Sequence, residues 1–146
     1  MNNAHSSAKL VVKAMAGAND PERCAQAFTV ASTALASGAE VSLWLTGDAA
    51  WFALPGKCEE FELPHSAKLA DLRDAILAGG KITLCTQCAV RRGISDGDQI
   101  PGIVIAGAAS FVEEILQPNV QAVVGITTPK MASFILVCVP LICGRI

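Results

Sequence analysis

The chain has 146 residues, of which 52% are hydrophobic and 16% are charged, so it holds enough apolar material for the core of one compact domain. Its formal net charge is -2, and its 11 lysine and arginine residues are scattered along the sequence. This pattern argues against a nucleic-acid-binding protein, which carries a basic patch, and against a protein that binds a membrane surface through a polybasic segment.

Residues 1–8 are expected to form a disordered N-terminal tail. They lack the charged start followed by an apolar run that marks a secretory signal. We therefore expect a cytoplasmic, reducing location. In that setting, the six cysteines are better interpreted as buried hydrophobes, metal ligands or redox groups than as a disulfide framework.

The first predicted unit is a strand, a helix and a second strand. Lys9 to Ala14 has the composition of a strand, and a helix is predicted from Pro21 to about Ser37 with Asp20 as its N-terminal cap. Cys24 lies on the apolar face of this helix and is expected in the core. Glu40 to Leu45 is the second strand, so the helix is a crossover between parallel strands.

Asp48 follows the second strand, in the segment Thr46-Gly47-Asp48. Open α/β sheets place ligands at the carboxyl ends of their strands, so Asp48 could face a site. The alternative is that Asp48 caps the short segment Ala49 to Ala53, and we prefer this interpretation.

The remaining elements complete an α/β fold, a three-layer α/β/α sandwich of the flavodoxin-like type with a mostly parallel sheet of about five strands. These elements are a helix from Ser66 to the stop signal Gly79-Gly80, a strand at Lys81 to Leu84, a short strand at Ile103 to Ile105, a helix at Ala108 to Leu116 and a strand at Val120 to Val124.

Residues 127–146 form an apolar C-terminal tail of unknown role, outside a folded domain predicted at residues 9–126. Met131 to Cys143 is apolar for 13 positions. A membrane-spanning helix needs about 20 apolar residues, and Pro140 is unfavourable in one, so a membrane span is not predicted. An extra edge strand, a segment buried in an oligomer and a foreign tail from a change of reading frame remain open.

The candidate site is the motif Cys85-Thr86-Gln87-Cys88, where a strand ends and a helix begins. Cys88 falls in the first helical turn, where free backbone N–H groups and the helix dipole favour thiolate over thiol. Arg91 and Arg92 lie three and four residues further on, so both are expected on the same side of the helix as Cys88. Candidate catalytic residues are therefore Cys88, Cys85, Arg91 and Arg92.

The spacing of Cys85 and Cys88 fits several chemistries. As zinc ligands, Cys85 and Cys88 would supply two of the four groups that a structural zinc site needs. The other closely spaced pair of cysteines, Cys138 and Cys143, lies in the apolar tail. As a dithiol they could form a small disulfide at a helix start, as in thioredoxin-like proteins. Cys88 alone could carry a sulfur atom as a persulfide. Both could also be buried structural cysteines. No metal or other cofactor is expected.

Two segments resemble the DsrE/DsrF/TusD-like proteins. They are Cys88-Ala89-Val90-Arg91-Arg92-Gly93-Ile94 and the helix phrase from Ile105 to Ile115, and the likeness extends over about Lys9 to Val124. The resemblance implies that Cys88 carries sulfur, that helices flank the sheet in a DsrEFH-like fold and that the protein forms a homo-oligomer, often a trimer or hexamer. Cys85 is a second thiol that many sulfur-relay members lack, and the tail after Ile126 lies beyond the usual end of the family.

The sequence therefore predicts a cytoplasmic sulfur carrier, or sulfurtransferase, of a sulfur relay. Cys88 would accept sulfane sulfur from a donor protein or a small persulfide and pass it to another thiol, with Arg91 or Arg92 stabilising the anion. One alternative is a CxxC dithiol oxidoreductase with peroxiredoxin- or thioredoxin-like activity. The other is a non-catalytic oligomeric binding module.

Overall fold

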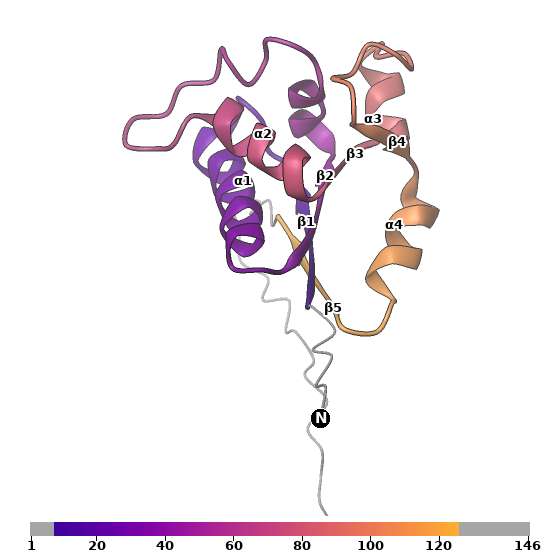
Figure 1. Ribbon diagram of the computed structural model, residues 1–146. Helices are drawn as coiled ribbons and strands as arrows, with labels where there is room; N and C mark the ends of the chain where they lie inside the picture. Colours follow the sequence, from indigo (N-terminus) through magenta and orange to yellow (C-terminus); the bar gives the residue numbers. More distant parts are fainter. Residues whose placement is uncertain (1–7, 126–146) are drawn as a thin grey trace, which may run out of the picture.

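The computed structural model of the protein describes residues 8–125 (Figure 1). The predictions for residues 1–7 and for the apolar tail at 127–146, including Cys138 and Cys143, lie outside the described residues. None of the helices in the described part combines the length and the apolar character needed to cross a membrane.

Within residues 8–125, five strands form one parallel sheet in the order β4-β3-β2-β1-β5. This confirms the predicted α/β fold with a parallel sheet. The strands are β1 (Lys9–Ala14), β2 (Glu40–Leu45), β3 (Lys81–Cys85), β4 (Val104–Ala106) and β5 (Val120–Val124).

Helices connect the strands and cover both faces of the sheet (Figure 1). The crossover from β1 to β2 begins at a capped helix start, because the Asp20 side chain accepts a hydrogen bond from the backbone N–H of Arg23, as the sequence predicted. The helical elements are α1 (Pro21–Ala36), the 3-10 helix η1 (Gly47–Ala53), α2 (Leu69–Gly79), α3 (Thr86–Arg91) and α4 (Ala108–Ile115).

The main core lies between the sheet and helices α1 and α2. Alternate strand residues point to this face, because side chains alternate along a strand with a period of two. Phe28 of α1 is fully buried there, and Cys24 is also at 0% exposure, as predicted for a core cysteine. The strand residues in this core are Val12, Ala14, Val41, Leu43, Leu45, Ile82 and Leu84.

A smaller core lies on the opposite face, under α4. The rings of Trp44 in β2 and Phe111 in α4 meet edge to face with centroids 5.3 Å apart. The Trp44 Nε1–H donates to Glu114 Oε2 at 2.7 Å, and the other oxygen of Glu114 pairs with Lys9 Nζ at 3.1 Å. Glu114 thus ties α4 to both β1 and β2.

The strand register places the site at one edge of the sheet. Ala14 is paired with Leu45, and Leu45 is paired with Leu84, so β1, β2 and β3 end almost level with one another. Because all three strands are parallel, the segments that follow them emerge at the same carboxyl edge. This arrangement brings the Cys85–Cys88 motif next to the residues that follow β1 and β2.

We expect the substitution Glu114→Ala to lower the free energy of unfolding by about 2–3 kcal/mol, because it leaves Trp44 without its acceptor and Lys9 without its buried partner. Burial by itself would raise the pKa of Glu114, but the hydrogen bonds from Trp44 and Lys9 outweigh it and lower that pKa. The contribution of Glu114 to the free energy of unfolding is therefore fully present above pH 4.3, which is about the pKa of glutamate in the unfolded chain. It is lost as the pH falls through the lower pKa of Glu114 in the folded protein.

Denaturant unfolding of both proteins from neutral to acidic pH checks this expectation. The exposed neighbour Glu113, replaced by alanine, is the matched control and should change stability little. Equal losses in the two variants, or a difference that grows in acid, would contradict the proposed role of Glu114.

Candidate functional site

Two backbone segments pack closely at the carboxyl edge of the sheet. The backbone N–H and the hydroxyl of Thr46, just after β2, both donate to the Ala14 carbonyl, at 2.9 and 2.8 Å. The Asp48 N–H donates to the Met15 carbonyl at 3.0 Å. The end of β2 is therefore held against the end of β1 by backbone hydrogen bonds.

Gly47 lies at the closest point of this packing. Its φ is +52°, and a Cβ at this position would lie 2.7 Å from the carbonyl oxygen of Met15. A side chain would therefore both clash and force an unfavourable backbone conformation. In the observed conformation, the Gly47 N–H donates to the Sγ atom of Cys88 at 3.2 Å.

Cys88 is the third residue of α3, so it lies in the first helical turn as predicted. Its side chain belongs to the main core, and the residue is only 7% exposed. This burial raises the pKa of the Cys88 thiol. The Gly47 hydrogen bond and the charge of Arg92 act in the opposite direction, whereas the neighbouring thiol of Cys85 raises the pKa further.

Burial therefore acts against the thiolate expected at Cys88, because it raises the pKa of this thiol. α3 has only six residues, so its dipole is short, while burial penalises the charged form of the sulfur directly. The backbone hydrogen bond that the Cys88 sulfur accepts from Gly47 acts in the opposite direction and lowers this pKa.

The two arginines lie in different surroundings. Arg91, the last residue of α3, is exposed. Arg92 turns back over the site: its guanidinium pairs with Asp48 at 3.5 Å, donates to the carbonyl of Cys88 at 3.3 Å and lies 5.8 Å from the ring centre of Trp51. Of the two predicted cations, Arg92 is the one that the structure brings to Cys88.

The preferred interpretation of Asp48 as a helix cap is wrong. η1 begins at Gly47, its N-cap is Thr46, and no side chain makes a capping hydrogen bond there. The carboxylate of Asp48 instead pairs with Arg92 across the site. The alternative interpretation, that Asp48 faces a site at the carboxyl end of a strand, agrees with this contact. The sequence did not identify Arg92 as its partner, because that pairing depends on where η1 and the end of α3 meet in space.

Cys85 occupies the N-cap position of α3 and is partly exposed, in contrast to Cys88. Cys85 lies three positions before Cys88 on the same side of the helix, and its thiol is close enough to raise the pKa of the Cys88 thiol. Both cysteines are free, so the pair is reduced. The structure thus brings together one accessible thiol and one buried thiol.

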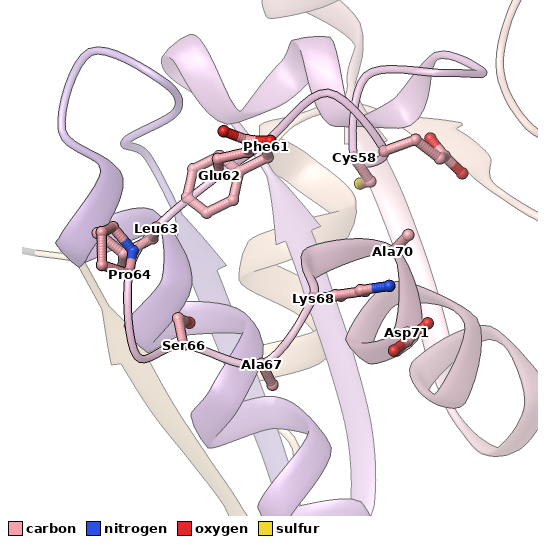
Figure 2. A pocket seen from close by; sticks show the side chains of 11 residues that line it. Cys58, Phe61, Glu62, Leu63, Pro64, Ser66, Ala67, Lys68, Ala70 and Asp71 are labelled. Carbon is pink, nitrogen blue, oxygen red and sulfur yellow. The ribbon is translucent and has the colours of Figure 1, made fainter.

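The other two described cysteines, Cys24 and Cys58, are packed into the core. Burial raises the pKa of Cys24 to about 12 and that of Cys58 to about 11. Cys58 borders a cavity of about 710 Å³ beneath the loop that leads to the start of α2 (Figure 2). Neither Cys85 nor Cys88 lines this cavity.

A metal site would need more ligands than the cysteine motif supplies. Within residues 8–125, the structure contains no group of three or more histidine, cysteine, aspartate or glutamate side chains that could hold a metal ion. Cys85 and Cys88 alone would provide two of the four ligands that structural zinc requires.

Gly47 and Trp51 are site residues that sequence reasoning missed. A glycine two residues after a buried strand was the available signal for Gly47, because glycine at such a position often lets the backbone come close to a ligand or to another chain segment. No comparable signal points to Trp51, whose part in the site depends on where η1 meets Arg92.

Comparison with known proteins supports the fold and identifies the family. The model of the DsrE/DsrF-like family matches residues 8–120. This chain belongs to the DsrE/DsrF-like family. The structure of this DsrE/DsrF-like protein is similar to the crystal structure of the ychN protein from E. coli, with a TM-score of 0.67 at 20% identity, covering 80% of this chain and 98% of the other. At that identity the likeness supports the fold alone.

Two archaeal proteins are similar in sequence. The uncharacterized protein MJ0760 of Methanocaldococcus jannaschii is 35% identical over 108 residues, which are 73% of this chain and 39% of that protein. The uncharacterized protein MK0008 of Methanopyrus kandleri is 33% identical over 98 residues, which are 67% of this chain and 78% of that protein. The matched region thus spans well under half of the M. jannaschii protein.

We expect the alkylation rate of Cys88 to rise with pH at a midpoint above the ordinary thiol value of about 8.5, because burial raises its pKa. The substitution Arg92→Gln should move this midpoint higher still, since it removes the positive charge that favours the thiolate. The exposed Arg91, replaced by glutamine, is the matched control and should leave the midpoint nearly unchanged. Iodoacetamide labelling with peptide mapping measures all three proteins, and a midpoint below 8.5 in the wild type would contradict the expected effect of burial.

The substitution Gly47→Ala should destabilise the protein by about 1–3 kcal/mol through backbone strain, with a further loss from the clash with Met15. It should also raise the pH midpoint for Cys88 alkylation, because it displaces the backbone N–H that donates a hydrogen bond to the Cys88 sulfur. Gly56→Ala is the control: Gly56 also has a positive φ, of +82°, but a Cβ there meets nothing within 4 Å. Denaturant unfolding and alkylation test both effects, and identical behaviour of the two variants would show that the Gly47 contact is unimportant.

Proposed function

We propose that this DsrE/DsrF-like protein carries sulfane sulfur as a persulfide on Cys88. It would take the sulfur from a donor protein or a small persulfide and pass it to another thiol. Family membership supports a role related to sulfur relay. The arrangement around Cys88 supports the finer assignment to that residue.

The observation that carries the proposal is the hydrogen bond from the Gly47 N–H to the Cys88 sulfur. A backbone N–H held by rigid strand-end packing is a preorganised donor for negative charge that develops on sulfur. Cys24 and Cys58, by contrast, are enclosed in the core, where burial raises their pKa values to about 12 and about 11, the latter despite the positive charge of Arg73 beside Cys58.

The transfer to Cys88 conserves electrons. A cysteine sulfur forms a bond to the outer sulfur of a donor persulfide, R–S–SH, and the donor S–S bond breaks. The proton of the cysteine thiol passes to the leaving group, which departs as the thiol R–SH, while the protein holds Cys–S–SH. Transfer to an acceptor thiol is the same step in reverse, so no oxidant or reductant is required.

Arg92 is the cation that would stabilise the anionic forms of this site. It lies beside Cys88 and is held in place by Asp48 and by the face of Trp51. Arg91 is exposed and has no comparable contact with Cys88. The sequence predicted that Arg91 or Arg92 stabilises the sulfur anion, and we assign this role to Arg92.

A dithiol oxidoreductase is the second candidate. The observation that favours it is the proximity of the two reduced thiols, Cys85 and Cys88, at the start of α3. Such an enzyme would close a disulfide between them during its cycle, whereas a sulfur carrier would gain a sulfur atom.

The homo-oligomer implied by the family resemblance stays a prediction. Apolar side chains are exposed on α4, at the C-cap residue that follows it and on the edge strand β5, as a surface that pairs with a second copy would require. These residues are Val112 (46% exposed), Leu116 (76%), Val123 (45%) and Val124 (45%).

Intact-mass measurement after incubation with glutathione persulfide tests the proposed function. The full-length chain should gain the mass of one sulfur atom, and a reducing agent should remove it. Residues 82–91 form a single tryptic peptide that contains both Cys85 and Cys88, so fragmentation of this peptide is needed to locate the sulfur. At the end point we expect it on Cys88.

The matched control is Cys58→Ala, which removes a thiol outside the site and should still gain the sulfur atom. The double variant Cys85→Ser/Cys88→Ser should gain none in this peptide. Loss of two hydrogen atoms in place of a mass gain would favour the dithiol oxidoreductase, and no change in the wild type would end the sulfur-carrier proposal.

A further inference from the structure

We propose that Cys85 is the thiol that first receives sulfur from the external donor, and that Cys88 then takes the sulfur from Cys85. This inference rests on the proposed function and deepens it. It divides the work between an outer thiol that meets the donor and an inner thiol that stores the sulfur.

The first argument is access. Cys85 is partly exposed at the N-cap of α3, whereas Cys88 is 7% exposed and packs in the main core. Thiol exchange depends on whether the attacking sulfur can be reached. A donor persulfide can therefore approach Cys85 in the structure as it stands, but it cannot approach Cys88 in the same way.

The second argument concerns what surrounds the inner sulfur. On one side the Cys88 sulfur accepts a hydrogen bond from the Gly47 N–H, and the backbone of Gly47 packs closely against the Met15 carbonyl. Arg92 bridges from the end of α3 to Asp48 and thereby ties α3 to η1 beside Cys88. Opening a path for a donor would mean moving the backbone packing that holds the strand ends together.

The third argument is the proximity of the two thiols. Cys85 is the N-cap and Cys88 the third residue of α3, so the two side chains are three positions apart on one side of the helix, and the Cys85 thiol is close enough to raise the pKa of the Cys88 thiol. A sulfur atom bound to Cys85 therefore starts out near Cys88. The second transfer then needs no diffusion of a partner and no opening of the core.

Each step balances. In the first, the Cys85 sulfur bonds to the outer sulfur of R–S–SH, the donor S–S bond breaks and R–SH leaves, which gives Cys85–S–SH. In the second, the Cys88 sulfur bonds to the terminal sulfur of that group, and the Cys85–sulfur bond breaks. The proton of Cys88 passes to Cys85, which is again a thiol, so no net oxidation occurs. The Gly47 N–H and Arg92 then favour the sulfur on Cys88.

A rapid-quench time course with glutathione persulfide tests the order of transfer. The reaction is stopped by alkylation, and fragmentation of the tryptic peptide at residues 82–91 locates the sulfur. In the wild type, sulfur should be found on Cys85 first and on Cys88 later. This measurement needs no variant, so it remains decisive even where a substitution disturbs folding.

Single variants test the same order. In Cys88→Ser, Cys85 should gain sulfur at the wild-type rate and keep it. In Cys85→Ser, loading of Cys88 should be slower by about tenfold or more, because the accessible thiol is absent. Cys85→Ala should behave like Cys85→Ser, and Cys58→Ala should load like the wild type. Circular dichroism confirms that each variant is folded.

Three outcomes would overturn the inference. If Cys85→Ser loads Cys88 at the wild-type rate while Cys88→Ser takes no sulfur, Cys88 is the direct acceptor and the proposed function stands without the relay. If the donor sulfur is released as sulfide with a Cys85–Cys88 disulfide, the sulfur is not stored at the inner thiol. If neither cysteine of the wild type takes sulfur, the proposed function itself fails.

Discussion

The site depends on the close packing of the backbone after β1 against the backbone after β2. The Ala14 and Met15 carbonyls accept hydrogen bonds from Thr46 and Asp48, and this packing leaves room only for a glycine at position 47. The Gly47 N–H is thereby directed at the Cys88 sulfur. A donor held in this way needs no rearrangement when charge develops on the sulfur, which is the advantage of preorganisation.

Burial and reactivity oppose each other at Cys88. The main core that stabilises the sandwich also encloses this sulfur and raises its pKa, whereas Gly47 and Arg92 partly compensate. A protected position suits a sulfur atom that must be stored, but it is unfavourable for first contact with a donor. Cys85 at the N-cap of α3 has the complementary property of exposure, so the two thiols together resolve a conflict that one thiol could not.

Much of the fold could be predicted from the sequence. Both the strand from Lys9 to Ala14 and the strand from Val120 to Val124 were predicted with the observed bounds, because β-branched runs between turn signals are a local property. Helix α1 could be predicted from Asp20 as its N-cap, from Pro21 as its first residue and from the spacing of its apolar residues. The short strand β4 was displaced by one residue, since its bounds depend on pairing with β3.

The sequence alone determined the element order, the parallel sheet, the motif Cys85–Cys88 at a strand end and the place of Cys88 in a first helical turn, because each follows from local composition and spacing. Only the tertiary structure decided that Cys88 is buried, that Arg92 rather than Arg91 adjoins it, and that Asp48 and Gly47 belong to the site. These properties depend on contacts between residues about 40 positions apart, such as Gly47 and Cys88. Burial and charge pairing are set by the neighbours that the fold brings together, and no local pattern encodes those neighbours.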